Sequence, residues 1–168
     1  YGDIVASRNP VNGLLPNPAL LERLFSRIGI GPDTRVVAYD DEGGGHAARL
    51  IWTLEVLGHR SASLLNGGMF SWANEGHPLE NGQVTPRSAR FQAGFDPEPL
   101  ADAEFILQRL DQPDLALVDA RSPAEYSGER RYSARGGHIP GAANWDWVPK
   151  SASALPSCMP SDPWGWRS

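Results

Sequence analysis

The sequence contains a single cysteine, Cys158, among its 168 residues. One thiol excludes an internal disulfide framework and a multi-cysteine zinc site, and it is compatible with a reducing compartment, so we expect a cytoplasmic protein. A surplus of basic residues is also lacking, because 15 Lys and Arg stand against 20 Asp and Glu for a formal charge of -5. This balance argues against nucleic acid or an anionic membrane as a partner.

Long apolar runs are absent too. No stretch approaches the roughly 18 to 20 residues that a membrane-spanning helix needs, and no secretory pattern precedes the first element. Glycine and proline are frequent, at 18 and 15 residues. Together they fall short of the roughly 25–30% that marks low-complexity chains. We therefore expect ordered elements joined by long loops, in a chain long enough for one domain or two incomplete ones.

Helices and short buried strands alternate along the first half of the sequence. Asn17 and Pro18 form a favourable helix start, and an apolar stripe follows at helical spacing. The expected elements are a helix at 17–29, a strand at 34–39, a helix at 46–58, a strand at 61–68 and a short helix at 69–76. This order is typical of a parallel sheet covered by helices, so the sequence predicts an α/β fold.

A second strand-to-helix unit follows a polar stretch that is rich in proline and glycine and is typical of a connector. A helix is expected at 101–111 and a strand at 115–120, and Ser122 with Glu125 fits a capping box for a further helix. The predicted parts are therefore a first repeat at 1–80, a connector at 81–100, a second repeat at 101–150 and an unstructured tail at 151–168.

The acidic, glycine-rich loop after the first strand has several possible interpretations. Gly43, Gly45 and Ala48 match a dinucleotide-binding fingerprint in spacing, but three acidic residues intervene and no ribose-binding acid follows about 20 residues later. A phosphate loop would need Gly-Lys-Ser/Thr, which is absent. The plainest interpretation is that Asp40 and Asp41 cap the next helix by accepting backbone N–H bonds.

Four stretches of the sequence carry a family resemblance. They are "RVVAYDDEGG", "LLNGGMFSWANEGHPLE", "LALVDARSPAEYSGE" and "GGHIPGAANW". The chain resembles the rhodanese family, specifically the tandem-domain thiosulfate and 3-mercaptopyruvate sulfurtransferases, from the second half of the first repeat to the first half of the second. The resemblance implies a fragment with a rhodanese-like parallel sheet flanked by helices, incomplete or circularly permuted. In the permuted form we expect "LALVDA" to pair with "RVVAY" in one sheet.

The resemblance also implies an activity. It implies transfer of sulfane sulfur from thiosulfate, or mercaptopyruvate, to a thiophilic acceptor through a cysteine persulfide. The family's nucleophile stands directly after the buried strand, where backbone N–H groups and a helix N-terminus lower the thiol pKa. Asp40 occupies that position, so we expect the first repeat to be silent. Cys158 has no strand before it and no glycine loop after it, so we expect the nucleophile loop to be missing and this chain alone to be inactive.

Four arginines of the second repeat are candidates for binding an anionic substrate: Arg121, Arg130, Arg131 and Arg135. The alternative for all four is a solvated loop with structural ion pairs. Many mercaptopyruvate-using relatives have an arginine where this chain has Glu125, which favours thiosulfate as the donor.

No cofactor or metal is expected, because His46 has no second histidine or cysteine at ligand spacing. His138, with Pro140 and Gly141, is assigned to stabilising a turn. The expected partners are a small-molecule sulfur donor and acceptor. A different class of function stays open, namely a non-catalytic rhodanese-like binding or regulatory module in which the Asp40 loop is only a structural cap.

Overall fold

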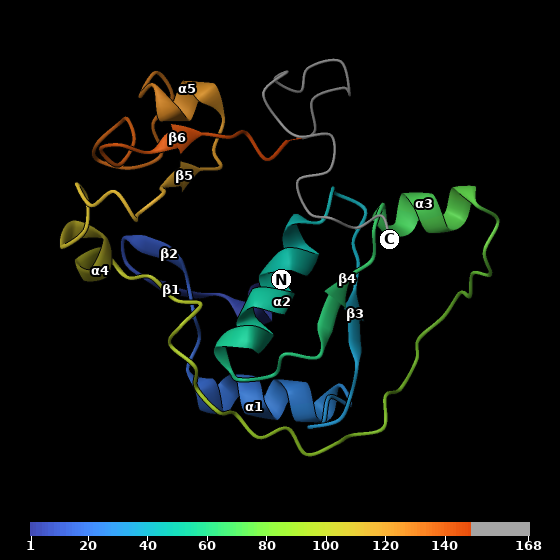
Figure 1. Ribbon diagram of the computed structural model, residues 1–168. Coiled ribbons are helices and arrows are strands. Elements are labelled where there is room, and N and C mark those ends of the chain that lie inside the picture. The colour runs from blue at the N-terminus through green and yellow to red at the C-terminus, as the bar shows by residue number, and fades with distance from the viewer. Residues whose placement is uncertain (149–168) are drawn as a thin grey trace. The chain divides into compact units, whose positions relative to one another are not determined.

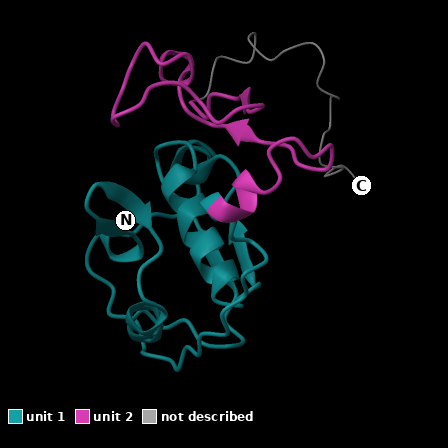
Figure 2. Ribbon diagram, turned by 90° about the vertical axis from the view of Figure 1, so that its left-hand side faces the viewer, with its two compact units in different colours: residues 1–103 teal, residues 104–168 magenta. Residues whose placement is uncertain are grey.

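The structure is a computed structural model that describes residues 1–148. The chain divides into two compact units, residues 1–103 and a second unit that begins at Glu104 (Figure 2). No helix within residues 1–148 is both long and apolar enough to cross a membrane. The tail expected to be unstructured, at 151–168, lies outside the described residues.

A parallel βαβ arrangement forms the centre of the first unit. Strand β3 (Val36–Ala38) pairs in parallel with β4 (Ala62–Leu64), and helix α2 (Gly45–Val56) connects them (Figure 1). Helix α3 (Gly68–Asn74) follows β4. The predicted order of strand, helix, strand and helix is therefore confirmed, and with it the α/β class.

Helix α1 (Pro18–Arg27) precedes this arrangement and begins as its sequence predicts. The side-chain oxygen of Asn17 accepts a hydrogen bond of 2.9 Å from the backbone N–H of Ala19, and Pro18 takes the first helical position. The helix turns Leu21 and Phe25 inward, where both are fully buried. Capping and burial thus act together to place this helix.

The hydrophobic core of the first unit includes a residue from the connector. Its buried members are Ile4, Leu21, Phe25, Ile30, Leu54, Leu57 and Phe91. The ring of Phe91 meets that of Phe25 edge to face at 5.2 Å. The backbone N–H of Gly94 also donates to the carbonyl oxygen of Leu57 at 2.9 Å. This part of the connector is therefore packed against the first unit, which its polar composition did not indicate.

A hairpin that the sequence analysis did not predict lies before α1. After a short 3-10 turn, η1 (Gly2–Ile4), strands β1 (Ala6–Arg8) and β2 (Val11–Leu14) pair antiparallel. The Arg49 guanidinium on α2 donates to the carbonyl oxygen of Gly13 at 2.9 Å and to those of Ile4 and Leu14. One arginine thus holds the start of the chain onto α2.

The second unit contains a smaller parallel pair. Strand β5 (Val118–Asp119) pairs with β6 (Ala143–Asn144), and helix α5 (Pro123–Tyr126) follows β5. The predicted capping box of Ser122 and Glu125 is present at the start of α5. Helix α4 (Ala103–Leu107) begins at the boundary between the units and is shorter than predicted.

The predicted pairing of residues 115–120 with residues 35–39 is wrong. β3 pairs with β4 and β5 pairs with β6, in separate two-stranded sheets of the described chain. Each strand takes a partner that a local connection supplies, so no pairing has to close a loop across the connector.

Candidate functional site

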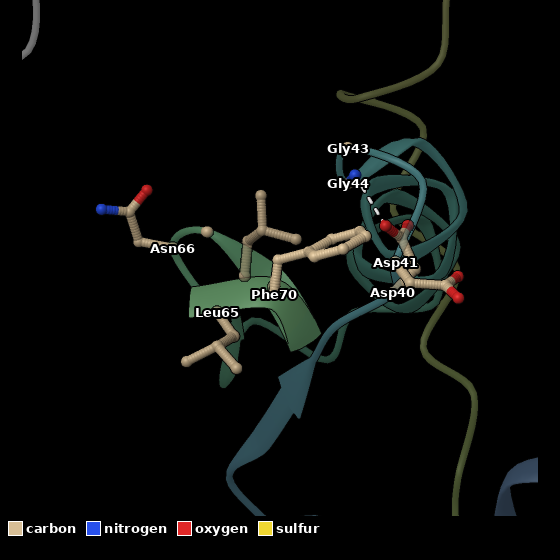
Figure 3. A pocket seen from close by; sticks show the side chains of 10 residues that line it. Asp40, Asp41, Gly43, Gly44, Leu65, Asn66 and Phe70 are labelled. Atoms are coloured by element: carbon tan, nitrogen blue, oxygen red, sulfur yellow. Dashed lines mark hydrogen bonds between the residues drawn. The ribbon is translucent and has the colours of Figure 1, made fainter. Parts of the chain in front are cut away.

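The loop between β3 and α2 curls around one carboxylate. Oδ1 of Asp40 accepts hydrogen bonds from the backbone N–H groups of Glu42 at 3.0 Å and Gly44 at 2.7 Å. Oδ2 accepts from the N–H of Ala47 in the first turn of α2 at 3.0 Å. Figure 3 shows the bond to Gly44. Three donors therefore converge on one side chain at the head of a helix, and we call these groups the Asp40 cradle.

Glycine makes this loop geometry accessible. Gly44 caps α2 with a φ of 95°, in the left-handed region that other residues rarely adopt. Gly68, with a φ of 55°, opens α3, and a Cβ there would lie 2.5 Å from the carbonyl oxygen of Asp40. The same carbonyl oxygen accepts a hydrogen bond of 3.0 Å from the N–H of Met69. The loops after β3 and β4 are thereby fixed to each other.

Backbone N–H groups hold the pKa of Asp40 below its ordinary value. The largest cause is the hydrogen bond from Ala47, followed by that from Gly44, and partial burial opposes them. Asp40 is therefore an ionised cap, as the plainest interpretation of the sequence predicted. Asp41 was predicted to cap the helix as well, but it accepts none of these bonds within the described residues.

A cavity of about 210 Å³ lies beside the Asp40 cradle. The loops after β3 and β4 line it, and Phe70 of α3 lies on one side (Figure 3). The carboxyl ends of parallel strands are where α/β proteins place their ligands. With Asp40 and Asp41 in its lining, the cavity carries negative charge and no nucleophilic sulfur.

His46, at the start of α2, contacts an acidic and an aromatic side chain. Its Nδ1 lies 3.4 Å from a carboxylate oxygen of Glu42, and its ring lies 4.7 Å from that of Tyr1. No cluster of potential metal ligands occurs among residues 1–148.

The second unit has a cleft of about 450 Å³ beside β5. Of the four candidate arginines, Arg121 and Arg135 line it, whereas Arg130 and Arg131 do not. The cleft also includes His138 on the loop before β6.

Arg121 is engaged with neighbouring groups. Its Nη2 lies 2.6 Å from Oδ2 of Asp119, its Nε lies 2.9 Å from Oδ1, and Nη2 also donates to the carbonyl oxygen of Gly137 at 2.8 Å. The hydrogen bond from Arg121 lowers the pKa of Asp119, and the same bond raises the pKa of Arg121. This geometry favours the ion-pair alternative for Arg121. Arg135 lines the cleft and makes no ion pair within residues 1–148.

His138 contacts the helix after β5. Its Nδ1 lies 2.9 Å from the carbonyl oxygen of Tyr126, and the two rings stack at 3.7 Å. The hydroxyl of Tyr126 donates to the carbonyl oxygen of Ala142 at 2.8 Å. These contacts support the turn-stabilising interpretation of His138. Asp119, the partner of Arg121, was not among the predicted site residues, although a spacing of two residues at the end of a strand was a usable signal.

Each described unit contains a parallel strand pair with a helix between its two strands, which defines an α/β protein. Residues 6–75 and 102–162 match the Rhodanese-like domain. The chain belongs to the rhodanese-like family, as the sequence motifs predicted.

Named relatives support this assignment. The chain is 45% identical over 139 residues to a thiosulfate sulfurtransferase of Azotobacter vinelandii, an alignment that covers 83% of this chain and 51% of the relative. It is 36% identical over 141 residues to a 3-mercaptopyruvate sulfurtransferase of Mus musculus, covering 81% and 48%. The chain therefore spans about half the length of these curated relatives.

A solved structure shares the fold. The crystal structure of SseA from Escherichia coli, described with the rhodanese fold of 3-mercaptopyruvate sulfotransferases, matches with a TM-score of 0.73 and 30% identity. The match covers 83% of this chain and 53% of that chain. This chain therefore shares the rhodanese-like α/β fold with SseA, in addition to the sequence motifs of the family.

Proposed function

We propose that this chain is part of a sulfurtransferase that moves sulfane sulfur to a thiophilic acceptor through a cysteine persulfide. The observation that carries the proposal is the Asp40 cradle. Three N–H donors converge on one side chain after a parallel strand, and such donors stabilise a thiolate or persulfide anion. Here the Asp40 carboxylate accepts the hydrogen bonds of these N–H groups, so we expect the first unit to be catalytically inactive.

The chemistry follows from one nucleophile. A thiolate attacks the outer sulfur of thiosulfate, the bond between the two sulfurs breaks, and sulfite leaves with its electron pair. The enzyme persulfide then gives this sulfur to an acceptor such as cyanide or another thiol. The nucleophile is proposed to be missing from residues 1–168, Cys158 included. Residues 1–80 and 101–150 are proposed to be parts of two repeats joined by residues 81–100.

Thiosulfate is the proposed donor. Arg135 lines the cleft beside β5 and makes no ion pair within the described residues, which favours the binding of a dianion there. Glu125 holds its carboxylate on Ser122 in the capping box, so the arginine that many mercaptopyruvate-using relatives have at this position, and that could bind the carboxylate of mercaptopyruvate, is missing here. Both donor and acceptor are small molecules, and the proposed location is the cytoplasm.

The second candidate function is a non-catalytic binding or regulatory module. The Asp40 cradle supports this alternative, since the Asp40 carboxylate already accepts the hydrogen bonds of the three N–H groups and no ligand is needed to accept them. Arg135 would then bind an anionic group of a partner. Sequencing the flanking DNA distinguishes the two functions, because the enzyme requires a downstream strand followed by a cysteine-glycine loop.

An assay of thiosulfate-to-cyanide sulfur transfer tests the location of the nucleophile. We expect no thiocyanate above the protein-free rate from the wild-type chain or from Cys158→Ser, because the sequence around Cys158 has no strand before it and no glycine loop after it to activate the thiol. Turnover that Cys158→Ser abolishes would place the nucleophile in the tail and contradict the proposal.

A further inference from the structure

Arg121 connects the end of β5 to the loop before β6. Besides its bonds to Asp119, its Nη2 donates to the carbonyl oxygen of Gly137 at 2.8 Å. The backbone N–H of Arg121 also donates to Oδ1 of Asp119 at 3.0 Å, so one carboxylate holds both the side chain and the backbone of this arginine. The Asp119 side chain is only 10% exposed, whereas that of Arg121 is 46% exposed. The guanidinium therefore joins a shielded carboxylate to the loop backbone.

Asn144 of β6 fixes the backbone that carries this pair. Its Nδ2 donates to the carbonyl oxygens of Asp119 at 3.0 Å and of Arg121 at 2.8 Å. These bonds add to the parallel pairing of β5 with β6. A side chain whose own backbone is already fixed loses less freedom when it forms a hydrogen bond. Arg121 is therefore well suited to hold another segment in place.

Gly137 is the point where the arginine-bearing loop closes. A Cβ on Gly128 would lie 2.8 Å from the backbone nitrogen of Gly137, so the two ends of segment 128–137 lie against each other. Arg135 stands two residues before Gly137 and His138 one residue after it, and both line the cleft beside β5. A hydrogen bond to the carbonyl oxygen of Gly137 therefore restrains the backbone that presents Arg135 to the cleft.

We propose that Arg121 is a positioning residue, which with Asp119 holds the Gly137 backbone and so directs Arg135 toward an anion in the cleft. The inference rests on the proposed function, because that anion is the sulfur donor. Arg121 itself does not bind the anion, since its Nε and Nη2 already donate to Asp119 and Gly137. The Asp119 carboxylate also offsets the charge of Arg121. The positive charge that attracts the anion is then that of Arg135.

Isothermal titration calorimetry of the full chain with thiosulfate tests this role, and Asp119→Asn is the most informative variant. The substitution removes a negative charge beside the cleft, so a simple charge effect, or an Arg121 released to bind the anion, would strengthen thiosulfate binding. A positioning role predicts the opposite, a weakening by about twofold to tenfold, which corresponds to the loss of one hydrogen bond. Asp114→Asn is the matched control and should leave the dissociation constant unchanged, because Asp114 pairs with Arg109 at 3.9 Å and does not line the cleft.

Arg121→Lys separates position from charge. Lysine keeps the positive charge but lacks the planar fork that bonds Asp119 and Gly137 together, so thiosulfate binding should weaken to a similar extent. In both variants the backbone NMR order parameters of Gly136 and Gly137 should fall from about 0.85, the value of a rigid backbone, toward about 0.6. Tighter binding by Asp119→Asn, unchanged binding by Arg121→Lys, or unchanged order parameters would overturn the proposal.

The wild-type chain distinguishes a failure of this inference from a failure of the proposed function. Absence of thiosulfate binding by the wild-type chain would contradict the proposed donor, and the positioning role with it. Binding that Arg135→Gln abolishes, but that neither Asp119→Asn nor Arg121→Lys weakens, would overturn the positioning role alone.

Discussion

Replacing Asp40 with cysteine, in a chain that also carries Cys158→Ser, is expected to create a thiol that is largely ionised at neutral pH. The N–H groups of Gly44 and Ala47, which now bind the carboxylate, would face the sulfur. Donors at a helix N-terminus lower a thiol pKa from about 8.5 to between about 3.5 and 7.5. The pH dependence of alkylation by iodoacetamide measures this pKa.

The same Asp40→Cys chain is expected to take up sulfur from thiosulfate. The thiolate attacks the outer sulfur and sulfite leaves, so the intact mass rises by one sulfur atom, and cyanide should remove it as thiocyanate. Asp41→Cys in the same Cys158→Ser background is the matched control, because Asp41 lies next to the cradle but accepts none of its bonds within the described chain. Equal thiol pKa values and equal sulfur uptake in the two variants would show that the cradle has no special effect.

Phe91→Ala is expected to destabilise the first unit by about 3–5 kcal/mol, the usual cost of removing a buried phenylalanine ring. Phe91 is only 2% exposed and contacts Phe25 across the core, although the surrounding sequence is that of a connector. Urea unfolding followed by tryptophan fluorescence measures the change in the free energy of unfolding.

Phe95→Ala is the matched control for this experiment. Phe95 lies four residues further along the connector and is 53% exposed, so its removal should change the free energy of unfolding by less than about 0.5 kcal/mol. If the two variants were equally stable, the connector would not be part of the core.

Local sequence signals predicted the elements that carry the candidate site. Asn17 and Pro18 predicted the start of α1, and Ser122 with Glu125 predicted the capping box of α5, because each signal acts over a few residues. The placement of Asp40 as a cap followed from its position between a strand and a helix.

Long-range packing was not readable from the sequence. Phe91 is buried by residues more than 30 positions away in the sequence. The prolines and glycines around it indicated a connector, so its burial was not predicted. The hairpin before α1 depends on Arg49, which lies on a distant helix. The strands predicted at 35–39 and 115–120 each pair with a strand nearby in the sequence and not with each other. Similarity between two repeats does not specify which strands pair.

We propose that the carboxylate of Asp40 accepts the hydrogen bonds that a sulfur anion would accept in an active unit, and an NMR titration of the backbone amides tests these bonds most directly. The hydrogen bonds lower the Asp40 pKa in the folded state, so their stabilisation is present above the ordinary value of 3.8 and is lost as the pH falls through the lower folded value. The amide resonances of Glu42, Gly44 and Ala47 should therefore shift together, with one midpoint below 3.8, and Asp40→Asn should abolish the shift. Amides that titrate separately, or with a midpoint at or above 3.8, would contradict the claim.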